Sequence, residues 1–371
     1  MNTPPPTEEP GWEKLVHQLG IRAENAVDLV RERFRHRIVP DKPIKIIPFH
    51  GMGNDTSCLL RGRVLEYPQK PADDAESIWR NLQDSYRRFE TDEIPDITVC
   101  LTVGDQRYHV QTDDEGYFLF EFPKPPEHTG HRLSVSLSLP DHPEQHDDTA
   151  GYIFFAPSAA AFGVISDIDD TVLVTQATSM IKMMRLTLLE SSESRVPFSG
   201  VATFYKALHD ATNPFFYVSS SPWNLFEFLD DFMHLNDITT GPLLLRDFGI
   251  DKTKLVAGPH KRHKLAQIRT VLEFYPDLRF ILIGDSGQHD PEIYSLVVEE
   301  FPDRILCIYI RDVGHAARDR QVQALATQLQ ARHVDMLLVP DTLAAATHAA
   351  SKGYIATHLP DLIAEELSVK I

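Results

Sequence analysis

The sequence predicts an α/β protein of two domains, in which a smaller antiparallel β-sandwich-like domain precedes a larger, doubly wound domain with a parallel sheet. Three observations support this prediction. From about residue 40 to 157, short segments alternate apolar and polar residues between turn residues, a pattern typical of antiparallel strands. From 158 to 371, wholly apolar runs alternate with helical patterns, as in parallel sheets buried on both faces. The length of 371 residues suits two or three domains.

The first 39 residues are expected to lie outside both domains. Residues 1–10 contain four prolines and two glutamates, so we predict a disordered lead. Apolar residues at helical spacing then predict an amphipathic helix between Trp12 and Phe34.

The β domain is predicted from period-two alternation and from turn residues. Its expected strands are 44–48, 59–65, 97–103, 117–122 and 133–139, with a glycine-rich turn at 51–55, a second turn at 113–116 and a helical insert at 78–89. No chemical motif is evident in this domain, whose role the sequence leaves open.

The second domain is predicted from its buried runs and the helical patterns between them. The expected strands are 162–165, 215–218, 280–283 and 305–310, with helices at 264–274 and 291–301. The tail, with apolar residues 336–339 and later alanine- and leucine-rich segments, is expected to add a strand and closing helices.

Composition excludes several classes of protein. The 36 Lys and Arg residues against 54 Asp and Glu give a net charge of −18, which argues against nucleic-acid binding and against polybasic docking on lipid. The three cysteines form no CxxC pair, so neither a zinc ribbon nor a disulfide scaffold is expected. The N-terminus does not resemble a signal peptide, and the apolar stretch 151–165 is too short to span a bilayer. These features predict a soluble, cytoplasmic protein.

Acidic residues follow the first apolar run. The segment 166–172 reads Ser-Asp-Ile-Asp-Asp-Thr-Val, which separates Asp167 and Asp169 by one residue. In such a pair, one carboxylate can attack phosphorus while the other protonates the leaving oxygen. Crowded carboxylates also favour a bound cation. The alternative is an acidic turn that caps the next helix through Asp169 or Asp170.

Two further segments offer a hydroxyl and a cation. The second apolar run ends in Ser219-Ser220-Ser221-Pro222, where a hydroxyl can bind a phosphoryl oxygen, although Ser-Pro also commonly starts a helix. The basic segment 260–264 precedes a helical pattern, and a lysine there can neutralise an anion. We favour Lys264 over Lys261 because Lys264 opens that pattern; a solvated basic cluster is the alternative.

The third apolar run ends in a glycine-containing loop that carries Asp285 and Asp290. Two carboxylates in such a loop suit a hard cation such as Mg²⁺, which takes oxygen ligands. The alternative is a loop in which Asp290 and Pro291 start the next helix.

The order of these motifs indicates a common site, because three of the four follow buried strands and open α/β sheets bind ligands at the carboxyl ends of their strands. The four motifs resemble the haloacid dehalogenase superfamily of phosphotransferases. Within it, the segments 167–172, 217–225 and 282–294 resemble the actin-patch-associated phosphatidate phosphatases, relatives of the lipins. The resemblance covers about residues 154–363, and segments near 61–64 and 112–118 resemble the N-terminal region of bacterial members.

The resemblance implies a haloacid dehalogenase-like fold and a Mg²⁺-dependent phosphatase that acts through an aspartyl-phosphate. Asp167 would be the nucleophile and Asp169 the general acid/base. Ser219 and Lys264 would hold the phosphoryl group, and Thr171 and Ser220 would contact the substrate. The implied Mg²⁺ ligands are Asp167, Asp169 through its main-chain carbonyl, Asp285 and Asp290.

The implied substrate is phosphatidate, a phosphorylated lipid, which suggests peripheral membrane contact. The interval 176–214 leaves no room for a large cap, and its methionine-rich helix 180–189 could touch an acyl chain or simply pack against the core. Two alternatives stay open: a phosphatase of a soluble or protein-borne phosphoester, and a non-catalytic binding protein that acts through the β domain. The sequence does not determine the oligomeric state.

Overall fold

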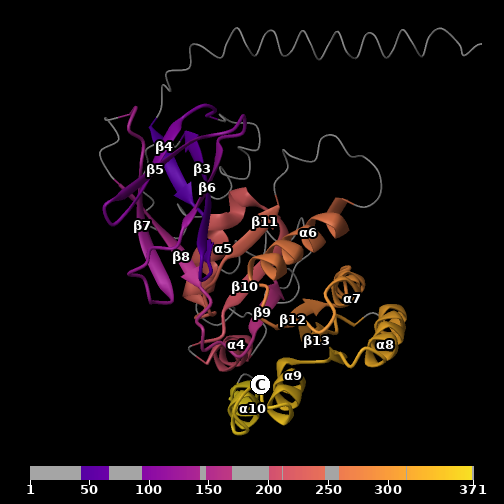
Figure 1. The fold of residues 1–371 in the computed structure, drawn as a ribbon. Helices are drawn as coiled ribbons and strands as arrows, with labels where there is room; N and C mark the ends of the chain where they lie inside the picture. The colour runs from indigo at the N-terminus through magenta and orange to yellow at the C-terminus, as the bar shows by residue number, and fades with distance from the viewer. Residues whose placement is uncertain are drawn as a thin grey trace, which may run out of the picture.

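The computed structural model describes residues 43–66, 94–142, 148–168, 200–210, 212–246, 259–314 and 316–369. The helices expected at 12–34, 78–89 and 180–189 lie outside these residues, as do Asp169 and Thr171. The described residues form a mixed β-sheet followed by a parallel sheet with helices around it (Figure 1). The α/β class with a β unit first is thus confirmed.

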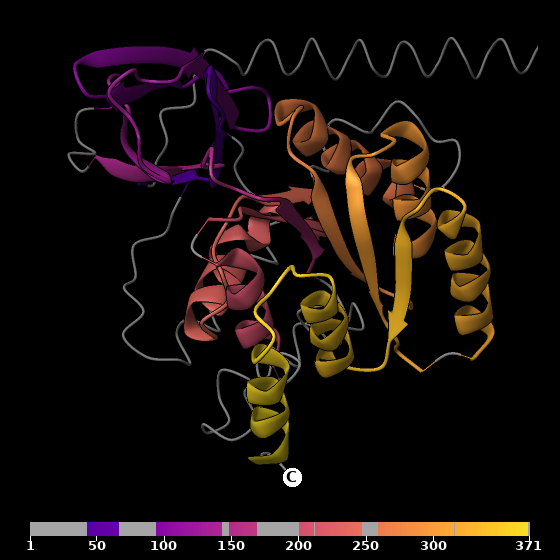
Figure 2. The same cartoon turned by 60° about the horizontal axis from the view of Figure 1, so that its bottom comes forward.

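The first sheet contains eight strands: β1 (Ile44–Pro48), β2 (Gly51–Gly53), β3 (Ser57–Glu66), β4 (Thr98–Val103), β5 (Gln106–Gln111), β6 (Tyr117–Pro123), β7 (Arg132–Ser138) and β8 (Thr149–Phe155). Their order is β1-β3-β2-β8-β7-β4-β5, and β6 pairs with β3. The sheet curls in Figure 2, and the rings of Tyr108 on β5 and Phe122 on β6 lie 4.9 Å apart. Three of its strands, β2, β5 and β8, were not among those predicted.

The expectation of a purely antiparallel sheet is wrong for one pair of strands. β2 and β8 run parallel, with Met52 opposite Phe154, whereas the other pairs in this sheet are antiparallel. The direction of β8 is set by its antiparallel pairing with β7, and that direction matches the direction of β2. A long-range pairing of this kind leaves no periodic signal in the sequence.

The turn expected at 51–55 is also wrong, because Gly51–Gly53 forms strand β2 and the bend follows it at 54–56. The two glycines allow close approach of neighbouring strands. A Cβ at Gly51 would lie 2.5 Å from the carbonyl oxygen of Leu59, and a Cβ at Gly53 would lie 2.4 Å from the ring of Phe155. Glycine in a strand marks such close contacts as well as turns.

The second sheet is wholly parallel, with the order β11-β10-β9-β12-β13-β14. Its strands are β9 (Gly163–Asp167), β10 (Phe215–Pro222), β11 (Leu243–Arg246), β12 (Phe280–Asp285), β13 (Ile305–Arg311) and β14 (Asp335–Val339). Each of the four apolar runs named from the sequence forms half or more of a strand, and β9, β10 and β12 continue from their runs into the predicted polar motifs. The chain therefore delivers those motifs to the carboxyl edge of one sheet.

Helices cover both faces of the parallel sheet (Figure 2). On one face lie α4 (Val201–His209), α5 (Phe226–Leu235), α9 (Thr342–Ser351) and α10 (Leu359–Val369), with the short 3₁₀ helix η2 (Trp223–Leu225) before α5. On the other face lie α6 (Pro259–Phe274), α7 (Asp290–Glu300) and α8 (Ala316–Gln330). Apolar side chains from both faces bury the sheet, which explains why its strands read as continuous apolar runs.

The two units of the fold are in direct contact. The hydroxyl of Tyr275, just after α6, donates to the carbonyl of Gly53 at 3.1 Å. The side-chain amide of Asn54 donates to the carbonyl of Phe274 at 3.0 Å. The end of β2 and the start of the turn that leads to β3 therefore lie against the end of α6.

Candidate active site at the carboxyl edge of the parallel sheet

Two acidic residues end neighbouring strands of the parallel sheet. Asp167 is the last residue of β9 and Asp285 is the last residue of β12, and these strands pair along Gly163–Ser166. Both side chains are fully buried. Because parallel strands end at the same edge, residues more than a hundred positions apart in the chain meet there, as the sequence predicted.

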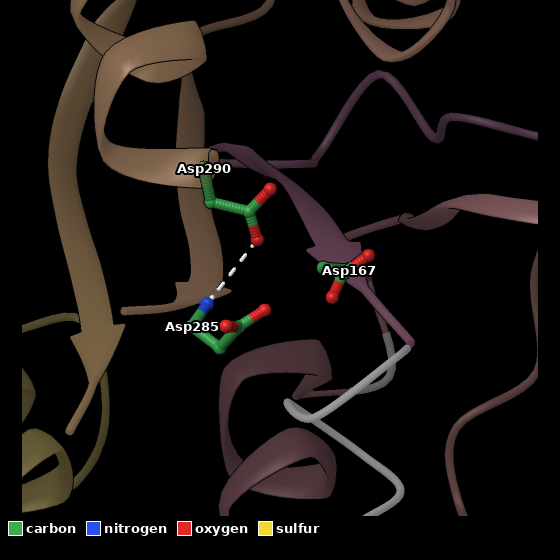
Figure 3. A group of neighbouring side chains, drawn as sticks. All are labelled: Asp167, Asp285 and Asp290. Atoms are coloured by element: carbon green, nitrogen blue, oxygen red, sulfur yellow. Dashed lines mark hydrogen bonds between the residues drawn. The ribbon is translucent and has the colours of Figure 1, made fainter. Parts of the chain in front are cut away.

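A third carboxylate completes the cluster. One side-chain oxygen from each of Asp167, Asp285 and Asp290 lies within 4.8 Å of the others (Figure 3). Asp290 is the first residue of α7, directly before a proline, so the alternative in which it starts a helix is also correct. It is nevertheless fully buried and faces the two strand ends. Asp290 therefore both begins helix α7 and belongs to the carboxylate cluster.

The loop after β12 fixes the orientation of these carboxylates. Backbone N–H groups of Gly287 and Gln288 donate to Asp285 Oδ1 at 2.6 and 2.8 Å, and the N–H of Asp285 donates to Asp290 Oδ2 at 3.2 Å. These hydrogen bonds fix the positions of the carboxylate oxygens. The loop therefore holds the side chains of Asp285 and Asp290 in defined orientations.

Lys264 provides the positive charge that the sequence predicted. Its Nζ lies 2.7 Å from Asp167 Oδ1 and also pairs with Asp290 Oδ1, and its side chain is buried. Burial alone would lower the pKa of Lys264, but the charges of Asp167 and Asp290 outweigh it and raise the pKa above its usual value. The ammonium group therefore stays charged and bridges two of the three carboxylates.

The reason given for preferring Lys264 over Lys261 is wrong. Helix α6 begins at Pro259, so Lys264 lies in its second turn and does not open it. The helical periodicity missed the first turn because that turn is polar apart from its proline. The side chain of Lys261 lies outside the described residues, whereas that of Lys264 is in the cluster.

The predicted serines lie on the strand next to Asp167. Val218 of β10 pairs with Asp167 of β9, and Ser219 is the next residue. Ser219 is fully buried, and its Oγ accepts the backbone N–H of Ser221 at 2.9 Å. Ser220 is only partly buried. The serine segment therefore borders the carboxylate cluster at the same edge of the sheet.

The charge of the cluster suits a hard divalent cation. Three carboxyl groups face one ammonium group in a buried site, so acidic groups outnumber basic ones in the cluster. Two carboxylate charges within 4.8 Å of each other would repel by about 3.5 kcal/mol or more at an effective dielectric of about 20, which a bound cation would offset. All the donor atoms are oxygens, as Mg²⁺ prefers. The residues present therefore fit the predicted magnesium site.

Two residues that support the site were not singled out from the sequence. Arg318 of α8 donates through Nε to the carbonyl of Ser286 at 3.0 Å and through Nη2 to that of Gln288, so it braces the loop after Asp285. Gly284 leaves room for Asp290, because a Cβ there would lie 2.3 Å from Asp290 Oδ2. Nothing in the sequence signals Arg318, whereas Gly284 stands directly before Asp285 in the motif.

One comparison with known protein families matches the segment that forms this site. Residues 162–312 match the family described as phosphatidate phosphatase APP1, catalytic domain. The chain is 34% identical over 192 residues to phosphatidate phosphatase APP1 of Saccharomyces cerevisiae, which covers 51% of this chain and 32% of the yeast protein. It is 29% identical over 210 residues to protein C29B5.04c of Schizosaccharomyces pombe, which covers 56% of this chain and 34% of that one. The matched regions thus span about a third of each relative.

Among solved structures, the carbohydrate acetylesterase XAC1771 of Xanthomonas citri aligns with 85% of this chain and 70% of its own. The identity is 10% and the TM-score 0.27, which is too low to support a conclusion about fold or function. Within the described part of the chain, no helix has both the length and the apolar character needed to cross a membrane.

Proposed function

We propose that this chain is a Mg²⁺-dependent phosphatase that hydrolyses phosphatidate to diacylglycerol and phosphate, because residues 162–312 match the catalytic-domain family of phosphatidate phosphatase APP1. One observation carries the proposal: Asp167, Asp285, Asp290 and Lys264 converge at the carboxyl edge of one parallel sheet. Phosphoryl transfer needs positioning and charge neutralisation, and these groups can supply both.

In the proposed reaction, a carboxylate oxygen of Asp167 attacks the phosphorus atom. The P–O bond to the glycerol oxygen breaks, and Asp169 gives that oxygen a proton, so that diacylglycerol leaves and an aspartyl-phosphate remains. Asp169 then takes a proton from water, whose oxygen attacks phosphorus. Inorganic phosphate is released and the Asp167 carboxylate is restored.

Lys264 and Ser219 would act on the transferred phosphoryl group. The ammonium of Lys264 already lies against the proposed nucleophile, where it can offset the negative charge that crowds around phosphorus. The hydroxyl of Ser219 would donate to a phosphoryl oxygen, and Ser220 and Thr171 would contact the substrate. Fixed donors of this kind contribute most where charge develops in the transition state.

The carboxylates of Asp167, Asp285 and Asp290 and the main-chain carbonyl of Asp169 would hold Mg²⁺. When bound, the ion supplies Lewis-acid stabilisation of the phosphoryl oxygens. The side chains of Asp285 and Asp290 would set the position of the ion. The ammonium group of Lys264 would keep the Asp167 carboxylate oriented toward the substrate.

A haloacid dehalogenase-like, doubly wound fold for residues 158–371 is part of the same proposal. Its support is the central place of β9, with β10 and β11 on one side and β12, β13 and β14 on the other. The strand order therefore reverses beside the proposed nucleophile, where ligands of open α/β sheets bind. The boundaries 1–39, 40–157 and 158–371 stay predictions.

The test is a phosphate-release assay on the full chain, with phosphatidate in detergent micelles and p-nitrophenyl phosphate as a soluble phosphoester. We expect turnover of phosphatidate that needs Mg²⁺ and is abolished by EDTA. Asp167→Asn should lower turnover by about 10³-fold or more without unfolding the protein. Asp303→Asn makes the same chemical change in an exposed turn before β13 and should leave turnover unchanged.

Each part of the proposal has its own refuting outcome. Wild-type turnover in Asp167→Asn would overturn the assignment of the nucleophile. Turnover of the soluble phosphoester without turnover of phosphatidate would overturn the lipid substrate and leave a phosphatase. A folded wild-type protein inactive on both substrates would favour a binding role.

A further inference from the structure

The backbone that carries Ser219 loses its regular strand pairing at the site. β10 pairs with β9 only as far as Val218, opposite Asp167. On its other edge the pairing with β11 is interrupted after Val218 and resumes at Pro222, with a shift of register between them. The sheet ladder therefore does not fix the backbone of Ser219–Ser221, and other contacts must place it.

Trp223, two residues after this irregular segment, is held by the β domain. The ring of Trp223 stacks on the ring of Phe49, with centroids 4.0 Å apart and planes at 14°. The guanidinium of Arg61, on β3, lies 5.6 Å from the Trp223 ring centroid and 5.0 Å from that of Tyr117. Trp223 is 8% exposed and Phe49 is 2% exposed. Aromatic and cation–π contacts from Phe49 and Arg61 thus anchor one end of the segment.

Phe49 is itself held firmly against the catalytic unit. It follows β1, where Lys45 Nζ lies 2.6 Å from a carboxylate oxygen of Glu227 on α5. It precedes His50, whose Nδ1 lies 2.9 Å from the carbonyl oxygen of Gly241. The Phe49 ring also lies 5.0 Å from the ring of Phe226 on α5. Contacts on both sides of Phe49 in the chain fix the surface on which Trp223 stacks.

A short path connects Trp223 to the hydroxyl of Ser219. The backbone N–H of Ser221, two residues before Trp223, donates to Ser219 Oγ at 2.9 Å. This bond sets the direction of the Ser219 hydroxyl, and its donor moves with the backbone that Trp223 anchors. We propose that Phe49 of the β domain is a positioning residue for Ser219, acting through the stacked ring of Trp223.

This inference rests on the proposed function, because it needs Ser219 to bind the phosphoryl group. It adds a role for the β domain, which would complete the site by holding the serine segment in register with Asp167. An error of about 1 Å in placing a catalytic group can lower the rate about 10²-fold. Removal of the Phe49 ring should therefore lower kcat on the order of 10- to 100-fold while the carboxylate cluster stays intact.

The test is a double-mutant cycle measured as kcat on phosphatidate in micelles, with wild type, Phe49→Ala, Ser219→Ala and the double variant. If Phe49 acts through Ser219, Phe49→Ala lowers kcat in the otherwise wild-type protein. In the Ser219→Ala background the same substitution changes kcat by less than about 3-fold, because the effects of coupled sites are not additive. Phe49→Leu keeps much of the apolar volume without the ring and should also lower kcat. It replaces Phe49→Ala in the test if Phe49→Ala does not fold.

The control is Phe122→Ala in the same β domain. Phe122 is also 2% exposed, but its ring packs on Tyr108, away from Trp223. This variant should lose stability and keep wild-type kcat at temperatures where it is folded. With Trp12 and Trp79 changed to Phe, Trp223 is the remaining tryptophan of the three, and its emission should shift to the red in Phe49→Ala but not in Phe122→Ala.

The outcomes separate the inference from the proposed function. A Phe49→Ala effect that persists in full in the Ser219→Ala background, or a folded Phe49→Ala with wild-type kcat, overturns the positioning role and leaves the function untouched. If Ser219→Ala itself keeps wild-type kcat, the role of Ser219 in the proposed function fails, and the positioning role fails with it.

Discussion

Gly284→Ala places one methyl group at the closest approach in the site. The added Cβ would lie 2.3 Å from Asp290 Oδ2 and 2.8 Å from its Cβ and Cγ. Real Cβ atoms do not approach other atoms this closely, so Asp290 or the end of β12 must move. Asp290 is fully buried and begins α7, which leaves little room for such a shift.

The losses of stability and of Mg²⁺ affinity follow from the contacts that this movement breaks. Overpacking a buried site typically destabilises a protein by about 1–3 kcal/mol. Displaced Asp290 would also lose the N–H of Asp285 and its pairing with Lys264. Changes in the groups that orient metal ligands lower metal affinity by about 10- to 100-fold. We therefore expect a folded variant about 1–3 kcal/mol less stable, with Mg²⁺ binding weakened by about 10- to 100-fold.

Urea unfolding gives the stability change and titration calorimetry gives the Mg²⁺ affinity. Gly130→Ala is the matched control, because the atoms nearest to its added Cβ would be in the ring of His128, at 3.4 Å or more, and the carbonyl of Arg132, at 3.9 Å. Gly130→Ala should leave both quantities unchanged. Wild-type stability and Mg²⁺ affinity in Gly284→Ala would refute the claim that Asp290 is fixed against β12 as part of a metal site.

Three further predictions concern charged groups. Burial lowers the pKa of His50 from its usual 6.5 despite neighbouring Asp230, so the unfolded chain binds the proton more readily. The free energy of unfolding should thus fall between about pH 7 and pH 5, and fall less in His50→Gln. Arg318→Ala frees the loop after Asp285 and should weaken Mg²⁺ binding about 10-fold by calorimetry. Lys264→Met leaves buried carboxylates uncompensated, so denaturant unfolding in EDTA should show a loss of about 3–5 kcal/mol, partly restored by Mg²⁺.

Each of these expectations has a contradicting result. An equal pH dependence in His50→Gln and wild type would show that His50 does not stay neutral in the folded state. Unchanged Mg²⁺ affinity in Arg318→Ala would show that the loop holds its shape without the guanidinium. A Lys264→Met variant as stable in EDTA as the wild type would show that the carboxylates do not need the ammonium.

The positions of the site residues were predictable because they follow local rules. Three of the four motifs come directly after an apolar run, and such runs form the centre of a parallel sheet whether or not their order is known. Asp167, Ser219 and Asp285 then have to meet at one edge. Their separation in the sequence does not matter, because the strands on which they lie are neighbours.

Other features could not be predicted because their partners are distant and lack a motif. Arg318 reaches the Asp285 loop from a helix beyond the next strand, and a single arginine in a polar helix has no distinguishing pattern. The parallel pairing of β2 with β8 and the stacking of Phe49 on Trp223 depend on how the two sheets close and meet. The first turn of α6 did carry a signal, since Pro259 stands at its first position, where proline is favoured.

Trapping of the reaction on Asp167 tests the proposed chemistry most directly. Enzyme mixed with phosphatidate and Mg²⁺ would be quenched in acid. Borohydride would then reduce the acyl phosphate, so that the phosphorylated residue carries the reduced side chain as a label. Mass spectrometry would identify the peptide that contains this label. We predict that the label falls on Asp167 and is absent from Asp167→Asn. Label on another residue, or phosphate release by Asp167→Asn at the wild-type rate, would contradict the role of Asp167 as nucleophile.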